Sequence, residues 1–377
     1  MLNTIRSWLV VAWFILRYTV AAWFDAKRPT ANGLDIYPEI FEVLHAFLGW
    51  NSNLHQVGDH HCPTDHATIL CGNHVKLDDP LYLFRTTHAD TQGRVAPFAM
   101  ARDDFFEGSI LKSRFFDGDD FFKSLGTFGV SRGGVTLAQM KPFLKFLAEG
   151  RSFILFPGRS RSRSGLFMDY RDDFQEPGGV SFFLGMTQRR HPDVTVSATP
   201  LIRTFNPVSK RSAMIYGPEQ FLPAKATREQ QREFDRNLVV VMSQHLEINV
   251  PHVLCAVLYL RCLHRLANPV AIHDLEVTLR TIFAGIDYPF VDPEATDDLP
   301  KAVRDTLHYL QELNMLRLHG EAVTLDADAI LSTPELDEKY RNHNPVKFLT
   351  NQILHLGDVT ERIQDVVLSP TLVEKAR

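Results

Sequence analysis

Between residues 67 and 202 the sequence alternates short apolar runs with segments of helical periodicity, and this alternation restricts the possible folds more than any other feature. The apolar runs have the length of buried strands. The expected strands are residues 67–71, 94–100, 126–132, 152–156 and 194–202, and the expected helices are residues 80–87, 135–149 and 180–186. Repeated strand–helix–strand order predicts an α/β fold with a mostly parallel sheet flanked by helices.

Polar and charged side chains follow three of the expected strands. His74 comes shortly after the first strand, Arg132 ends the third, and an arginine-rich loop follows Phe156. In a parallel sheet, ligands bind beyond the carboxyl ends of the strands. We therefore expect these side chains to gather at one edge of the sheet.

His74 and Asp79 are a candidate pair for acid–base chemistry. Side chains five residues apart do not share one face of a helix, so these two meet only if the chain turns between them. Asp79 would then bind one imidazole nitrogen and leave the other to take a proton from a hydroxyl group, as a general base does. The alternative is a loop histidine that precedes a helix start.

The loop of residues 156–165, FPGRSRSRSG, alternates three arginines with serine and contains no acidic residue. Arg159, Arg161 and Arg163 form the basic series. Alternating Arg and Ser is also typical of disordered or RNA-binding tracts, but those are longer and do not directly follow a buried strand. Guanidinium groups match phosphate oxygens in pairs, and each charged hydrogen bond contributes about 1.5–3 kcal/mol. The loop therefore predicts a phosphate clamp.

The segment of residues 8–24, WLVVAWFILRYTVAAWF, is the most apolar part of the chain. Seventeen residues is the lower limit for spanning a bilayer, and Arg17 interrupts the run. Trp8, Trp13 and Trp23 are typical of a helix at the lipid interface. We expect a membrane-associated helix on the cytoplasmic face, followed by a second helix at residues 37–50. A cleaved signal peptide and a helix buried against the soluble domain are the alternatives.

Composition excludes several classes of protein. A net charge of −5 over 377 residues argues against a nucleic-acid binder. The four cysteines lack the spacing of a disulfide framework, which indicates reduced thiols in a cytosol-facing protein; they are Cys62, Cys71, Cys255 and Cys262. Asp59-His60-His61-Cys62 lacks the four regularly spaced ligands of a zinc site, so we expect no metal.

Four sequence blocks, taken together, resemble the glycerolipid acyltransferase family, which includes the glycerol-3-phosphate and lysophosphatidate acyltransferases. The first is Asn73-His74 with Asp79, which matches the N-H-x-x-x-x-D block of the family. The second is Gly126 with Arg132, the third is Phe156-Pro157 followed by Arg161-Ser162, and the fourth is the apolar run that ends at Thr199-Pro200. The resemblance covers about residues 40–220.

This resemblance implies an O-acyltransferase of phospholipid biosynthesis. The acyl donor would be acyl-CoA or acyl-carrier protein, the acceptor a phosphate-bearing glycerol or lysolipid, and no further cofactor would be needed. The residues it assigns fall into three groups: catalytic His74 and Asp79; phosphate-binding Arg132, Arg159, Arg161 and Arg163; and supporting Asn73, Gly126 and Ser162.

One departure from the family pattern keeps other functions open. Gly158 stands where the third block of the family carries a functional glutamate, and Arg159 replaces the glycine that follows it. A catalytically impaired homologue that binds lipid or a partner protein is therefore one alternative. A hydrolase that activates water with His74 and Asp79 is another, although the chain has no G-x-S-x-G motif.

The C-terminal third has mainly helical periodicity. Thr227 and Gln230 form a capping-box pattern that begins a long helix, expected to continue to Pro251. We expect membrane-associated helices in residues 1–50, the catalytic domain in residues 51–250, and a helical domain with one hairpin in residues 251–377. That last region loosely resembles the helical part of larger glycerol-3-phosphate acyltransferases, through Tyr340-Arg341-Asn342 and Ile353-Leu354-His355.

Overall fold

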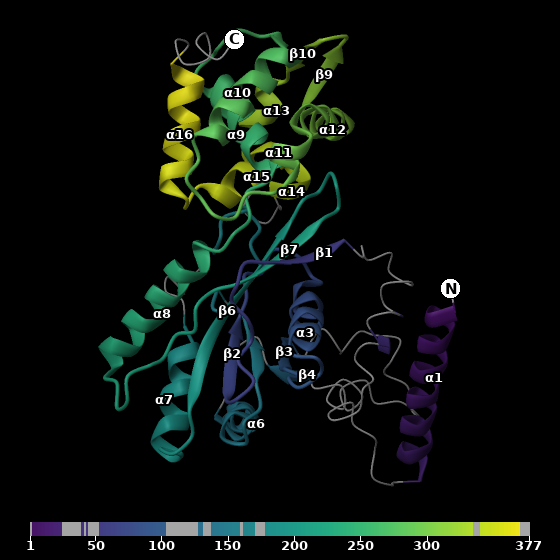
Figure 1. Cartoon of the computed structure of the whole chain (residues 1–377), viewed down its shortest axis with the longest axis vertical. Helices are drawn as coiled ribbons and strands as arrows, with labels where there is room; N and C mark the ends of the chain where they lie inside the picture. The colour runs from purple at the N-terminus through teal and green to yellow at the C-terminus, as the bar shows by residue number, and fades with distance from the viewer. Residues whose placement is uncertain are drawn as a thin grey trace.

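A seven-stranded sheet organises the N-terminal two thirds of the chain (Figure 1). The computed structural model describes residues 2–24, 39–40, 43, 53–102, 127–130, 137–158, 161–169, 178–334 and 340–369. The strands, in spatial order, are β1 (Leu54–Val57), β7 (Ser212–Tyr216), β6 (Val196–Phe205), β2 (Ala67–Cys71), β5 (Phe153–Leu155), β3 (Phe98–Arg102) and β4 (Thr127–Val130). From β6 to β4 all neighbours are parallel, whereas β7 is antiparallel to β6 and parallel to β1. The predicted mostly parallel sheet is confirmed.

Both faces of the sheet are covered, which explains why its central strand is almost wholly apolar. Ile69 and Cys71 of β2 pack in one cluster with α6 (Leu137–Ala148), α7 (Val180–Arg190) and α8 (Arg228–Ser243). Leu70, between them, packs in a second cluster with α3 (Asp79–Asp90) and with Phe14 of α1 (Leu2–Trp23). Successive side chains of a strand point to opposite faces, so a strand covered on both sides buries every residue. All five residues of β2 are buried.

The expected elements of this region are present, with ends that differ by a few residues. One of the two largest differences is at β3, which begins at Phe98 although the apolar run begins with Arg94-Val95; the other is at α7, which continues to Arg190. A turn at the end of α3 is the reason for the late start of β3. The Thr91 hydroxyl donates to the Thr87 carbonyl (2.7 Å) and accepts from the Val95 N–H (3.1 Å), so the chain is still turning at Val95.

The helix predicted from Thr227 to Pro251 begins correctly but its end is wrong. Thr227 and Gln230 form the predicted capping box, and α8 ends at Ser243. After it, the Ile248 N–H donates to the Phe290 carbonyl and the Ile248 carbonyl accepts from the Asp292 N–H, both at 2.8 Å. These distant partners draw the backbone out of the helix, and Asn249 caps a new helix from Val250.

The C-terminal region is mainly helical, with one small sheet. Its helices are α9 (Val250–Leu263), α10 (Ile272–Ala284), α11 (Glu294–Asp297), α12 (Leu299–Glu312), α13 (Ala327–Leu331), α14 (Tyr340–His343), α15 (Pro345–Ile353) and α16 (Gly357–Leu368). The strands β8 (Val270–Ala271), β10 (Ala322–Leu325) and β9 (Leu316–His319) pair in that order, and β9 with β10 forms the predicted hairpin. The domain limits at residues 50 and 250 stay a prediction.

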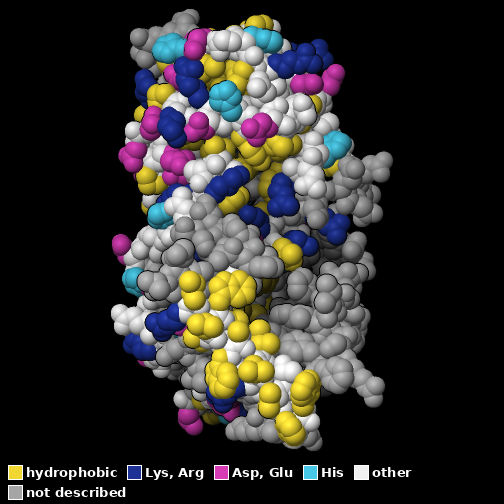
Figure 2. Space-filling model, turned by 90° about the vertical axis from the view of Figure 1, so that its right-hand side faces the viewer, with side chains coloured by type: hydrophobic (Ala, Val, Ile, Leu, Met, Phe, Trp, Pro, Cys, Tyr) yellow, Lys and Arg dark blue, Asp and Glu magenta, His cyan; other side chains and the backbone are white. Residues whose placement is uncertain are grey.

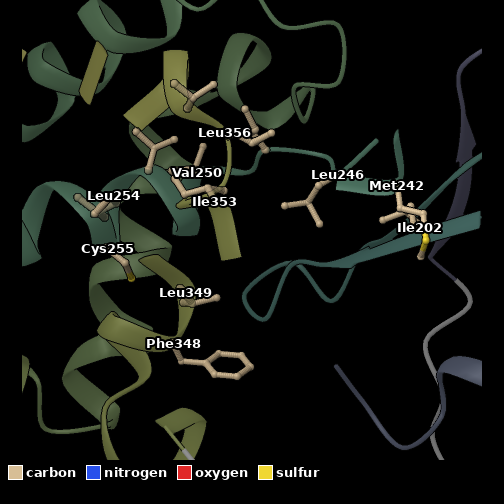
Figure 3. Close-up of a cluster of buried hydrophobic side chains, with 14 of the residues drawn as sticks. Ile202, Met242, Leu246, Val250, Leu254, Cys255, Phe348, Leu349, Ile353 and Leu356 are labelled. Atoms are coloured by element: carbon tan, nitrogen blue, oxygen red, sulfur yellow. The ribbon is translucent and has the colours of Figure 1, made fainter. Parts of the chain in front are cut away.

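One hydrophobic core runs from the sheet into the C-terminal helices (Figure 3). Ile202 of β6 and Met242 of α8 lie at one end of the cluster in the close-up. Leu246 lies between them and the side chains of α9 and α15, among which are Val250 and Ile353. The two regions are therefore packed as one body.

Helix α1 exposes most of its apolar side chains. Phe14 and Tyr18 are buried, while Trp13 and Trp23 are about 60% exposed (60% and 61%). The predicted apolar segment is thus helical, and no helix of the described residues combines the length and apolarity that crossing a bilayer needs. Of the second expected helix, residues 37–50, only Glu39, Ile40 and Val43 are among the described residues.

Candidate active site

The loop between β2 and α3 folds back so that His74 and Asp79 meet. His74 Nδ1 lies 3.1 Å from Asp79 Oδ2. The same carboxylate oxygen accepts the backbone N–H groups of Val75 and Lys76, each at 2.7 Å. Asp79 is the first residue of α3, and Pro80 favours a helix start there because its fixed φ suits the first turn. The aspartate thus closes the turn that its five-residue spacing from His74 requires.

Arg203 of β6 holds the other oxygen of Asp79. Its Nη1 donates to Asp79 Oδ1 (2.9 Å) and to Asp78 Oδ1 (2.8 Å). Asn73 secures the same strand, because its side-chain amide donates to the Arg203 carbonyl and accepts from the Arg203 N–H, both at 2.9 Å. Asn73, Asp79 and Arg203 are all buried. The supporting place that the family resemblance gives Asn73 thus has a geometric basis.

The surroundings of Asp79 keep its carboxylate ionised. Burial alone would raise the pKa of Asp79, but the hydrogen bond with His74 and the charge of Arg203 outweigh it, so the pKa lies below its ordinary value. An ionised acceptor at Nδ1 assigns the proton of neutral His74 to that nitrogen. Nε2 is then the nitrogen with a free lone pair, as a general base requires.

Phe156, at the end of β5, supports the imidazole from one side. The two rings stack with centroids 4.3 Å apart and planes inclined by 23°. Gly72 makes room for this contact, because a Cβ there would lie 2.9 Å from Phe156 Cε1 and 2.7 Å from Leu83 Cδ2. The His74 side chain keeps 19% of its surface exposed, enough for a substrate to reach it.

The described part of the arginine loop lies against the His74 loop. The Ser162 N–H donates to the His74 carbonyl (2.7 Å), and the Ser162 hydroxyl accepts from the Gly165 N–H (3.0 Å). Asp169 accepts the N–H groups of Arg163 (2.5 Å) and Ser164 (3.2 Å) and so closes the loop. The structure therefore brings Ser162, Arg161 and Arg163 next to the His74 loop.

Three residues named from the sequence are not among those that the structure describes. They are Gly126, Arg132 and Arg159. Gly158 is described, and a Cβ on it would meet Met168 at 3.4 Å, an ordinary contact distance. The glycine is therefore not required there by close packing.

Two cationic residues of the site were not identified from the sequence. One is Arg203, which directly follows the apolar run of residues 194–202 and lies within β6. The other is Lys76, whose Nζ lies 3.4 Å from the centroid of the Phe205 ring. Burial, aided by the positive charges of Arg203 and Arg341, lowers the pKa of Lys76 to about 8 against the opposing effect of Asp78 and Asp79. The sequence feature that could have identified Lys76 is its position between His74 and Asp79.

The described ranges contain no group of three or more His, Cys, Asp and Glu side chains that could hold a metal ion. All four cysteines are free and buried. Burial raises the pKa of Cys71, which ends β2 just before the site, well above its ordinary value. A thiol in that state is a poor nucleophile. Cys71 is therefore not a candidate nucleophile for this site.

Comparisons with known proteins give little beyond this geometry. No protein-family model matches the chain, and no curated protein sequence matches it. Among solved structures, the 1-acyl-sn-glycerophosphate (LPA) acyltransferase PlsC from Thermotoga maritima aligns with 63% of this chain and 95% of its own. The aligned parts share 16% sequence identity, and the TM-score is 0.34. At these values the likeness does not identify a shared function.

Proposed function

We propose that this chain is an O-acyltransferase of phospholipid biosynthesis. It would transfer a fatty acyl group from acyl-CoA or acyl-carrier protein to a hydroxyl group of a glycerol-3-phosphate-type acceptor. The observation that supports this most directly is a histidine, oriented by a buried carboxylate, beside a loop that carries arginines. The four sequence blocks of the glycerolipid acyltransferases support it independently.

In the proposed reaction, His74 acts as general base and no acyl-enzyme forms. Nε2 takes the proton of the acceptor hydroxyl as its oxygen attacks the thioester carbonyl. A C–O bond forms, the C–S bond breaks, and the leaving thiolate receives the proton from the imidazolium. Asp79 stabilises that imidazolium through Nδ1. Base catalysis of this kind contributes a factor of roughly 10²–10⁴, and positioning of the substrates supplies much of the remainder.

The arginine loop would bind the phosphate of the acceptor. Arg161 is exposed and Arg163 is half-buried, on a backbone that Ser162 fastens to the His74 loop. Arg132 and Arg159 are further candidates from the sequence. Binding the phosphate beside His74 places the acceptor hydroxyl near its base, and such positioning lowers the entropic cost of the reaction.

Helix α1 would attach the protein to the cytoplasmic face of a membrane. Figure 2 shows a stripe of apolar side chains over the lower half of one side of the molecule. Exposed apolar residues of α1 include Trp8, Leu9 and Trp13. A helix with tryptophan on its exposed side suits the region between lipid headgroups and acyl chains. Acyl chains and lysolipid products partition into the same layer.

A non-catalytic homologue that binds lipid or a partner protein is the second candidate. Its support is Gly158, which occupies the position of a functional glutamate in the family block. Because a Cβ fits at this position, Gly158→Glu is a direct test. Acyl transfer that appears only in the Gly158→Glu variant would favour this candidate over the first.

The purified chain, given labelled acyl-CoA or labelled acyl-carrier protein in separate reactions, tests the proposed function. Glycerol-3-phosphate and lysophosphatidate are added separately, and a third reaction contains no acceptor. We expect labelled lipid with at least one acceptor. Release of free fatty acid at the same rate without acceptor would indicate a hydrolase instead. No turnover across both acceptors and both types of donor would overturn the proposal.

A further inference from the structure

The C-terminal helices bind the arginine loop directly. The Tyr340 N–H of α14 donates to the Arg163 carbonyl (2.9 Å). The Asn351 side-chain amide of α15 donates to the Ser164 carbonyl (2.8 Å). Gly165 follows at a φ of +90° and touches α15 so closely that a Cβ on it would lie 2.2 Å from the Phe348 carbonyl oxygen. Backbone atoms of three consecutive loop residues are thus in contact with α14 and α15.

The same short loop is also fastened to the proposed base. Ser162 donates its N–H to the His74 carbonyl, and the next three residues contact the C-terminal helices. The loop therefore lies between the two regions. Any ligand held by this loop beside His74 is also next to α14.

Arg341, on α14, is placed to reach such a ligand. It directly follows Tyr340, and its side chain is exposed. Its positive charge acts on the Lys76 ammonium of the His74 loop and contributes to the lowered pKa of Lys76. In the part of the chain that the structure describes, Arg341 forms no ion pair or side-chain hydrogen bond, and the same holds for Arg161.

Three cationic residues belong to the segments that meet here, Lys76, Arg161 and Arg341, and the acid of the arginine loop, Asp169, is engaged by the backbone N–H groups of Arg163 and Ser164. Asp78 and Asp79, the acids nearest Lys76, are already engaged by Arg203. In Figure 2, Lys and Arg side chains lie across the middle of the molecule, between its upper part and the apolar stripe. Repulsion among neighbouring cations disfavours such an arrangement unless an anion binds between them.

We infer that Arg341 of the C-terminal region completes the acceptor site, where it binds the phosphate monoester of the acceptor together with Lys76 and the arginine loop. This inference rests on the proposed function and extends it, since the phosphate would be bound from both regions of the chain. A dianionic monoester suits Arg341, Lys76 and Arg161 together better than a singly charged diester does. CoA also carries a phosphate monoester, but the arginine loop is fastened to the His74 loop, and His74 is the proposed base for the acceptor hydroxyl, which favours the acceptor as the bound phosphate.

Calorimetric titration of the full-length chain tests this without requiring turnover. The ligands are glycerol-3-phosphate, glycerol and CoA, and the variants are Arg341→Gln and Arg341→Lys. Arg280→Gln is the matched control, because Arg280 is an exposed arginine on α10 and is not one of the site residues. We expect Arg341→Gln to weaken glycerol-3-phosphate binding by about ten- to a hundredfold, the effect of one charged hydrogen bond. Arg341→Lys should recover part of it, and Arg280→Gln should match the unaltered protein.

Steady-state kinetics provide a second measurement. Arg341→Gln should raise the KM for glycerol-3-phosphate or lysophosphatidate and leave the KM for acyl-CoA unchanged. A larger effect on CoA binding than on acceptor binding would overturn the assignment, as would equal losses in Arg341→Gln and Arg280→Gln. Phosphate binding that depends on Arg341 without acyl transfer would contradict the proposed function and leave this inference standing. If the Arg341→Gln variant transfers acyl groups with an unaltered acceptor KM, the role of Arg341 is contradicted and the proposed function is supported.

Discussion

The guanidinium of Arg203 lies 2.9 Å from the carboxylate of Asp79, a residue 124 positions earlier in the chain. Both side chains are only 2% exposed. Removing one partner of a buried ion pair leaves a charge without compensation and costs about 3–5 kcal/mol. We expect Arg203→Met to lower the free energy of unfolding by about this amount. Urea denaturation measures it, and a loss below about 1 kcal/mol would show that the pair does not hold the loop.

His74→Ala should remove acyl transfer without unfolding the protein. The expected decrease in kcat is a factor of roughly 10²–10⁴, because the acceptor hydroxyl loses its base. His319→Ala is the matched control, since His319 is an exposed histidine on β9. Equal activity of the two variants would eliminate His74 as the base. Circular dichroism melting curves establish that both remain folded.

Asn351→Ala should impair acceptor binding more than donor binding. The substitution removes the hydrogen bond that fixes the Ser164 carbonyl, so the arginine loop loses one of its contacts with α15. One hydrogen bond makes a net contribution of about 0.5–1.5 kcal/mol. Its loss should therefore raise the acceptor KM by roughly two- to tenfold. Initial rates at varied acceptor and varied acyl-CoA measure the two KM values separately. Equal changes in both would argue for a general loss of structure.

Glu247 should make stability fall as the pH rises. Burial raises the pKa of Glu247 from 4.5 to about 7, against the opposing charge of Arg211 and with the support of Asp292 and Glu294. Between these two values the folded state binds more protons than the unfolded state, so raising the pH destabilises the fold. Glu247→Gln should abolish this contribution. Urea denaturation from pH 5 to pH 8 should therefore show the variant gaining stability relative to the unaltered protein, and parallel curves would disprove the assignment.

Trp13→Ala together with Trp23→Ala should weaken binding to membranes. Both side chains are about 60% exposed on α1, so their removal should change lipid contact far more than packing. Co-sedimentation with phosphatidylglycerol-containing vesicles measures the bound fraction. Phe221→Ala is the control, because Phe221 is an exposed aromatic residue far from α1 in sequence. An unchanged bound fraction in the double variant would remove α1 as the attachment site.

Features that follow from local sequence could be predicted. β2 was identified residue for residue because a strand buried on both faces has no polar interruption long enough to obscure it. The Thr227 cap of α8 was equally clear, since it depends on residues three positions apart. The meeting of His74 and Asp79 required only a turn of a few residues.

Features that depend on distant partners could not be predicted. The end of α8 is set by Ile248 pairing with the backbone around Val291, which leaves no trace near Ser243. Arg203 follows the expected strand of residues 194–202, and nothing near it in the sequence indicates that Asp78 and Asp79 are its partners. The contact between Asn351 and Ser164 joins residues 187 positions apart.

The shared core of Figure 3 has a consequence for dissecting this protein. Met242, Leu246 and Val250 are fully or almost fully buried in a single cluster that also contains Ile353. A chain cut near residue 250 would expose the apolar side chains of this cluster to water. Fragments with such exposed apolar surface normally aggregate. Heat should therefore melt the sheet and the C-terminal helices in one step, and neither half should be recoverable as a working module.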